Sequence, residues 1–115
     1  MIEKWIQLEN WIVSQLKEVD SFIKRTPGSG NGACKGDIKF STNLGLHIEA
    51  KYRNKKSVYD ESWMTKAQCE IPLHVKKVPI IFTMNKDDRI RVHMDATDFL
   101  DIFKRSLEAY RRGND

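Results

Sequence analysis

Glu49 and Lys51 stand two residues apart in a stretch, residues 46–53, in which apolar and polar side chains alternate. Such alternation is typical of a half-buried β-strand, where every second side chain points to the same face. Glu49 and Lys51 should therefore lie side by side on a polar face. A carboxylate beside an ammonium group is common on a solvated sheet. The pair could do chemistry if a second carboxylate reached the same place.

Asp37 is the candidate for that second carboxylate, because residues 37–41 also read as a strand and a short polar turn separates them from residues 46–53. This arrangement predicts a hairpin. Side chains that face each other across antiparallel strands lie about 5 Å apart, so Asp37 and Glu49 could share a cation. Hard oxygen ligands select Mg²⁺, for which Mn²⁺ can substitute. The backbone carbonyl of Ala50 could complete the metal shell.

Glu9 is a third acid with an unusual position. Residues 3–24 read as an amphipathic helix, and Glu9 falls inside its apolar sector, about 40° from Trp5 at 100° per residue. A carboxylate aimed at the core is costly unless it is paired or bound to a cation. Glu9 is therefore either a helix-edge residue whose head reaches water or a further acid of the same site.

These residues together are suited to cutting a phosphodiester. A divalent ion held by the carboxylates would neutralise charge on the phosphate and lower the pKa of a bound water. Lys51 would stabilise the negative charge that grows in the transition state, or orient the attacking water. The Glu-x-Lys spacing alone is weak, since charged residues make up 31% of the chain. Asp37 and Glu9 are what strengthen it.

The elements that must position these residues follow the order helix, two strands, helix, two strands, helix. This order predicts one α/β domain over residues 1–115, with a mixed β-sheet flanked by helices. Residues 79–84 form a nearly continuous apolar run that suits a central strand covered on both faces. The remaining predicted elements are a helix from about residue 61 to between 71 and 75, a strand at 89–94 and a helix from about 97 to 112.

The glycine-rich stretch at residues 25–36 precedes the first strand. Glycine lets a backbone approach a phosphate closely. The stretch lacks the GxxxxGK(S/T) spacing of a nucleotide-binding loop, so no nucleotide cofactor is expected. It is either a mobile linker or a loop that contacts the substrate.

The bulk properties narrow the class of partner. The 115 residues carry a net charge of +4, which favours an anionic partner without naming it. The two cysteines form no spaced framework, so a reducing, cytoplasmic setting is expected. No apolar run approaches a membrane span. The three histidines have no zinc-ligand spacing and are expected to be surface or partly packed residues, whereas Trp5 and Trp63 are expected in the core.

The pattern Asp37…Glu49-Ala50-Lys51 resembles the signature of the PD-(D/E)xK nucleases, with Gly36 where the family name has proline. More narrowly, residues 5–95 resemble the archaeal-type Holliday junction resolvases and their phage relatives. The similar pieces are residues 8–16, Arg25, residues 27–30, residues 37–38, residues 48–51 and residues 67–68.

The resemblance implies a restriction-endonuclease-like fold and a magnesium-dependent homodimer that cuts four-way DNA symmetrically, in the cytoplasm of a cell or of a virus's host. By position, it makes Asp37 and Glu49 metal ligands and Lys51 the catalytic lysine. Glu9 would be a further acid near the metal, and Ser29 a loop residue that touches the scissile region.

Several further residues are expected to contact the DNA, mainly through its phosphates. The full set is Arg25, Ser29, Lys35, Arg53, Lys55, Lys56 and Gln68. Two alternatives stay open. One is a nuclease or nickase of the same superfamily that acts on other DNA in repair, flap removal or packaging. The other is a non-catalytic nucleic-acid-binding module that kept the fold.

Overall fold

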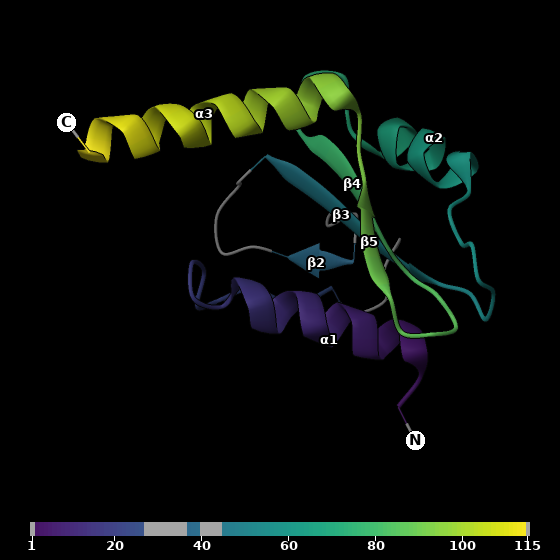
Figure 1. Ribbon diagram of the computed structural model, residues 1–115. Helices are drawn as coiled ribbons and strands as arrows, with labels where there is room; N and C mark the ends of the chain where they lie inside the picture. Colours follow the sequence, from purple (N-terminus) through teal and green to yellow (C-terminus); the bar gives the residue numbers. More distant parts are fainter. Residues whose placement is uncertain (1, 27–36, 40–44, 115) are drawn as a thin grey trace.

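The computed structural model describes residues 2–26, 37–39 and 45–114 of the chain (Figure 1). Within these residues the elements follow one another as helix, three strands, helix, two strands, helix. Their bounds are α1 Lys4–Leu16, β1 Lys24–Arg25, β2 Ile38–Lys39, β3 Leu46–Tyr52, α2 Glu61–Glu70, β4 Val78–Met84, β5 Ile90–His93 and α3 Ala96–Asn114.

The main sheet has the strand order β3-β4-β5. β3 runs parallel to β4, with Leu46 opposite Val78 and Tyr52 opposite Met84, and β5 pairs with β4 in the antiparallel sense. Parallel neighbours need a crossover connection, which α2 supplies here. The sequence prediction of an α/β domain with a mixed sheet is therefore confirmed, and β4 is the central strand that its apolar run predicted.

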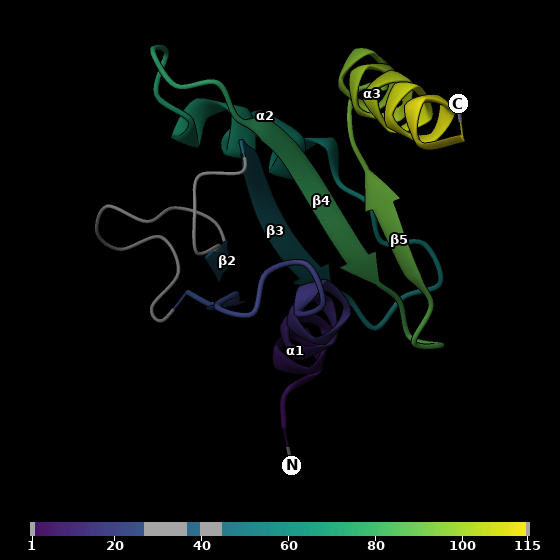
Figure 2. The same ribbon diagram turned by 90° about the vertical axis from the view of Figure 1, so that its left-hand side faces the viewer.

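Two helices cover opposite faces of this sheet (Figure 2). Leu8 and Ile12 of α1 pack in one core cluster with Ile48 of β3 and Ile80 of β4. On the other side, α2 residues pack against Ile81, the next residue of β4. Successive strand residues point to opposite faces, so the two clusters lie on the two sides of the sheet. β4 is therefore covered by helices on both faces, and β3, which carries Glu49, lies beside it at the edge of the sheet.

The first helix is shorter than predicted. It ends at Leu16 rather than near residue 24, and Val19, expected on the buried stripe, is 80% exposed. The chain turns at Asp20, whose buried carboxylate accepts the backbone N–H of Phe22 at 3.1 Å. A short acidic side chain that binds its own backbone competes with continued helix. The helix therefore ends although apolar residues continue at helical spacing beyond it.

The predicted hairpin of residues 37–41 and 46–53 takes a different form. β2 pairs antiparallel with β1, a two-residue strand that the sequence pattern did not indicate, and β3 takes its ladder partner from β4 instead. Asp37 still lies beside β3, because its N–H donates to the carbonyl of Ile48 at 2.8 Å. Residues 40–41 of the predicted strand and most of the predicted turn fall outside the described residues.

The last helix stands apart from the rest of the chain (Figures 1 and 2). Every α3 side chain that the structure describes is exposed except that of Asp98, which is half-buried. Val92 of β5, predicted to point inward, is 50% exposed as well. Within the described ranges, no helix is both long and apolar enough to cross a membrane.

Candidate functional site

The acids and the lysine singled out in the sequence line one pocket at the outer edge of β3. Its volume is about 300 Å³. Segments that are far apart in the chain meet there: α1, the residue before β2, β3 and α2. The lining residues are Trp5, Glu9, Asp37, Glu49, Ala50, Lys51, Tyr52, Lys66 and Glu70.

The edge position of β3 explains why these residues can meet. Ala50 belongs to the core cluster that faces α1, so Glu49 and Lys51, its neighbours, point to the α2 side. Because β3 has a ladder partner on one side only among the described strands, groups from both faces can reach around its free edge.

Asp37 is held against that free edge by two backbone contacts. Its N–H donates to the carbonyl of Ile48, and its carboxylate Oδ2 accepts the N–H of Ala50 at 2.7 Å. The side chain is buried. Its carboxyl group is also within interaction range of Glu49. The proximity that the sequence required of these two acids is therefore present, though it arises from a bridge to β3 rather than from a hairpin ladder.

Glu9 enters the site from α1 and is only 3% exposed. Arg25 Nε donates to Glu9 Oε1 at 2.6 Å, and the same guanidinium lies 5.7 Å from the centre of the Trp5 ring. Burial raises the pKa of Glu9, and the Arg25 contact only partly offsets this. The reading of Glu9 as a residue whose head reaches water is wrong. Arg25, which stays a predicted DNA contact, makes this ion pair with Glu9, while Trp5 is 43% exposed rather than in the core.

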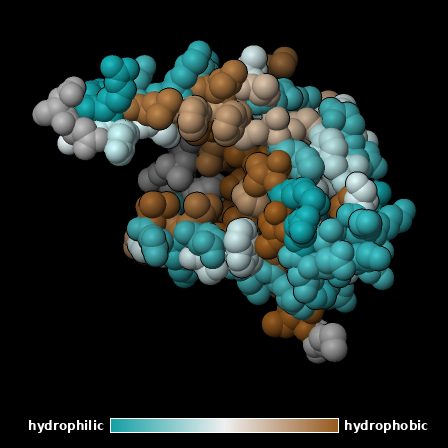
Figure 3. All heavy atoms as spheres, in the orientation of Figure 1, coloured by the Kyte–Doolittle hydropathy of each residue, from teal (hydrophilic) through white to brown (hydrophobic). Residues whose placement is uncertain are grey.

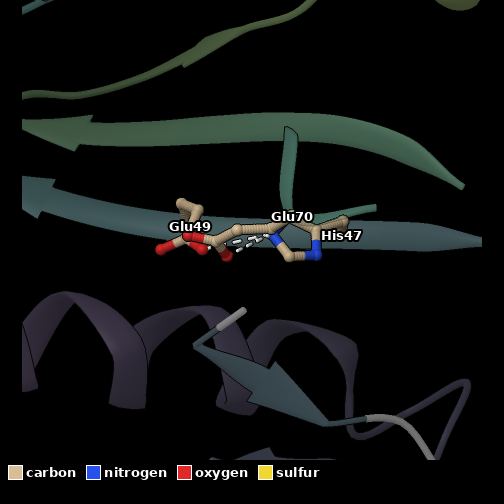
Figure 4. Close-up of side chains that lie close together, drawn as sticks. All are labelled: His47, Glu49 and Glu70. Carbon is tan, nitrogen blue, oxygen red and sulfur yellow. Dashed lines mark hydrogen bonds and ion pairs between the residues drawn. The ribbon is translucent and has the colours of Figure 1, made fainter. Parts of the chain in front are cut away.

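His47 and Glu70 were missed by the sequence reasoning (Figure 4). His47 is buried, and its Nε2 lies 3.1 Å from Glu49 Oε1 and 3.4 Å from Glu70 Oε2. The expectation of a surface or partly packed histidine is wrong because α2 covers the face that carries it. A signal for Glu70 was present: Trp63, Lys66 and Glu70 are spaced by three and four residues and so share one face of α2.

Glu49 is the best-connected acid of the pocket. Burial acts to raise the pKa of its carboxyl, but the contacts with His47, Asp37 and Lys51 outweigh burial and lower that pKa below the ordinary value. Glu49 is therefore ionised at neutral pH, as a metal ligand must be.

Lys51 lies at the mouth of the pocket, half-buried, with its Nζ 5.9 Å from the centre of the Trp63 ring. The guanidinium of Arg53 lies 4.7 Å from the same ring and 3.5 Å from Asp60. Trp63 is half-buried and thus serves as a platform for two cations as well as packing on the core. Among the described residues Lys51 lies near the acids but forms no ion pair with them, which suits a group that must meet an anion from outside.

One cluster among the described residues could hold a divalent cation, and it differs from the predicted ligand set because His47 and Glu70, rather than Asp37, stand beside Glu49. Carboxylate oxygens converge in a small pocket, and ligand atoms of His47, Glu49 and Glu70 all lie within 4.8 Å of one another. Oxygen donors select Mg²⁺ or Mn²⁺, and an imidazole nitrogen shifts the preference toward Mn²⁺. Crowded carboxylates in a partly buried site repel one another, and a cation would relieve that repulsion.

The other predicted DNA contacts lie outside the pocket. Arg53, Lys55 and Lys56 are exposed on the connection that follows β3. Gln68 is also exposed, and its amide donates to Asp95 at 3.4 Å rather than reaching the pocket. Ser29 and Lys35 lie outside the described residues.

The chain was also compared with known proteins. No protein-family model, no curated protein and no solved structure matches it.

Proposed function

We propose that the protein is a divalent-metal-dependent DNA endonuclease, with four-way junctions as its preferred substrate. One observation carries the proposal. Glu9, Asp37 and Glu49, from three separate segments, line a single pocket together with Lys51. Glu49 and Lys51 share one strand, so the support comes from Glu9 and Asp37, which reach the same pocket from other segments.

Each residue has a distinct role in this proposal. Asp37, Glu49 and the carbonyl of Ala50 would hold Mg²⁺ or Mn²⁺, with Glu9 as a further acid beside them. The bound cation would neutralise a phosphate and lower the pKa of a water molecule. Lys51 contributes a fixed positive charge where negative charge develops on the phosphate oxygens.

His47 acts as a positioning residue in the same scheme. Its Nε2 lies within reach of both Glu49 and Glu70, so it joins β3 to α2 and limits the orientations that Glu49 can adopt. A ligand held in one orientation loses less entropy when it binds a metal. Glu70 adds a further carboxylate, whose oxygen lies within 4.8 Å of the ligand atoms of His47 and Glu49.

The choice of DNA as substrate rests on charge and on the resemblance to resolvases. The net charge is +4, and the exposed bases Arg53, Lys55 and Lys56 follow directly after Lys51 on the chain. Basic side chains next to the proposed catalytic lysine would bind the phosphates that flank a cut. The preference for a four-way junction over a flap or a linear duplex comes from the resemblance alone.

The test compares substrates and metals. The wild-type chain is incubated with a four-way junction, a flap and a linear duplex, each with Mg²⁺, Mn²⁺ or EDTA. The proposal expects metal-dependent nicking of the junction that Asp37→Asn abolishes, since asparagine keeps an acceptor for Ala50 N–H but loses the charge. Absence of nicking by wild type, or undiminished nicking by Asp37→Asn, would refute it. Nicking of the flap or duplex instead would identify another nuclease of the same superfamily.

A second candidate is a non-catalytic module that binds branched DNA. One observation favours it: each of the three acids already has a partner within the chain, namely Arg25 for Glu9, the Ala50 N–H for Asp37 and His47 for Glu49. Carboxylates that already have partners within the chain gain less free energy from binding a cation. This candidate predicts salt-sensitive binding to the junction that EDTA does not change, with no cleavage under any metal.

A further inference from the structure

One side of α3 presents large hydrophobic side chains to solvent, and we call this surface, together with Val92 of β5, the α3 face. The exposed fractions of these residues run from 45% for Leu107 to 71% for Tyr110. Val92 and Phe99 line a shared pocket of about 630 Å³, so the face is continuous from β5 onto the helix. Its members are Val92, Phe99, Leu100, Phe103, Leu107 and Tyr110.

Figure 3 shows hydrophobic atoms along the side of α3 that borders a hollow between α3 and α1. An amphipathic helix in a folded protein is stabilised mainly by burying its apolar side. α3 is 19 residues long, yet the described part of the chain leaves that side open. The helix therefore lacks, within those residues, the contact that normally maintains it.

The spacing along α3 indicates what kind of surface would fit. Leu100, Phe103, Leu107 and Tyr110 follow one another at intervals of three, four and three residues. This is the spacing of helices that pack along another helix. Phe99 widens the seam, because its ring stacks on that of Phe103 at a centroid distance of 5.6 Å. The α3 face is thus shaped to receive a second helix with an apolar seam.

We propose that the α3 face joins two copies of this chain, with the α3 helix of each copy packed against that of the other. Each copy presents the same seam, so a two-fold axis makes the surface its own complement. Aromatic side chains bury roughly 150–250 Å² each when fully covered. Half-exposed members therefore offer on the order of 500 Å² per copy, or about 1,000 Å² from the two copies together, which is the lower bound for a specific interface.

The charges on the rest of α3 favour a second copy over a lipid surface. The other sides of the helix carry three acids and four bases, so two copies do not repel each other strongly. A helix that lies on an anionic membrane usually has a polar side rich in lysine and arginine without such a share of acids. The charged residues are Asp98, Asp101, Lys104, Arg105, Glu108, Arg111 and Arg112.

This inference does not depend on the proposed nuclease activity. The resemblance to resolvases implies a homodimer but names no surface, whereas the assignment to α3 comes from the exposure and spacing of its side chains. A dimer built in this way would form whether or not the pocket at β3 binds metal or DNA.

The experiment measures the mass of the full chain by sedimentation velocity between about 1 and 100 µM, without DNA or metal. Wild type is expected to be a dimer in this range. Phe103→Asp should raise the dissociation constant at least 100-fold, because it places a charge in the centre of the seam. Phe22→Asp is the matched control: Phe22 is 76% exposed and lies outside α3, so its dimer should be unchanged. Far-UV circular dichroism and thermal unfolding at low concentration check that both variants are folded.

Three outcomes would overturn the proposal. The first is a wild-type chain that stays monomeric up to 100 µM. The second is a dimer that Phe103→Asp leaves intact, or that Phe22→Asp disrupts equally. The third is a monomer that binds anionic vesicles, with Phe103→Asp abolishing that binding, since a membrane would then be the occupant of the face.

Discussion

The pocket at the edge of β3 and the α3 face depart from ordinary folding in opposite ways. At β3, charged groups such as Glu9 and Asp37 are buried, while at α3 large hydrophobic groups such as Phe103 and Tyr110 are exposed. Burying a carboxylate and exposing an apolar stripe both cost stability. Both regions would be relieved of that cost by contact with something outside the chain, which under the two proposals is a cation with an anionic substrate at the pocket and a second copy at the α3 face.

The largest expected effect is on the rate of cleavage, and it should be confined to residues of the pocket. Lys51→Ala should lower the rate of junction cleavage by about 10²–10³-fold, the usual cost of removing one group that stabilises transition-state charge. Lys104→Ala, the same change on the polar side of α3, should leave the rate within about twofold. Initial nicking rates at saturating Mg²⁺ measure both. Equal losses for the two lysines would show that only overall charge matters.

The second effect is on the free energy of unfolding, which should depend on the buried core but not on the α3 face. Leu8 is fully buried, so Leu8→Ala should lower the free energy of unfolding by about 2–5 kcal/mol. Leu107→Ala should lower it by less than about 0.5 kcal/mol when the chain is dilute enough to be monomeric, as for other surface changes. Urea denaturation measures both values. A large loss for Leu107→Ala in the monomer would mean that the chain itself covers α3.

The third effect is the response of stability to metal. Saturating Mn²⁺ at about 100 times its dissociation constant should raise the free energy of unfolding by about 2.7 kcal/mol. Glu49→Gln should remove most of this gain. His47→Asn should reduce the gain from either ion by less than Glu49→Gln does, since it loosens the orientation of Glu49 but removes no ligand. Thermal unfolding with each ion gives the comparison, and an unchanged gain in Glu49→Gln would place the metal elsewhere.

The smallest effect concerns the buried charge of Glu9. Burial raises its pKa above the ordinary 4.5, so the folded chain holds the proton more tightly than the unfolded chain. Ionisation of Glu9 therefore lowers stability as the pH rises from about 4.5 through the folded pKa. Glu9→Gln removes this loss, so its stability relative to wild type should improve over that interval. Urea denaturation at a series of pH values tests the sign; a relative decline of the variant would mean that Arg25 outweighs burial.

The parts of the site that could be predicted depend on local pattern. Alternation over residues 46–53 indicated β3 and placed Glu49 beside Lys51, and β3 spans Leu46–Tyr52. The rotation of about 100° per residue in a helix placed Glu9 inside the apolar sector of α1. These inferences hold because side-chain direction in a strand or a helix follows from position along the element.

The parts that could not be predicted depend on contacts between distant segments. His47 was expected at the surface or partly packed, but it is buried where α2 meets β3. Glu70 enters the pocket only because α2 crosses from β3 to β4. β1 has two residues, too few for any periodicity. The same limit applies to α3: its stripe predicted a helix with an apolar side, but no pattern within one chain states what that side contacts.

The parallel pairing of β3 with β4 has a consequence for how the chain reaches its native state. Every pair of this ladder, from residues 46 and 78 to residues 52 and 84, joins distant positions of the chain, and closing such a long connection costs entropy before any contact rewards it. The acids from α1 and β3 can gather early, whereas Glu70 arrives only when the crossover docks. The part of the metal affinity that depends on Glu70 should therefore appear late in refolding, and would report completion of the sheet rather than initial collapse.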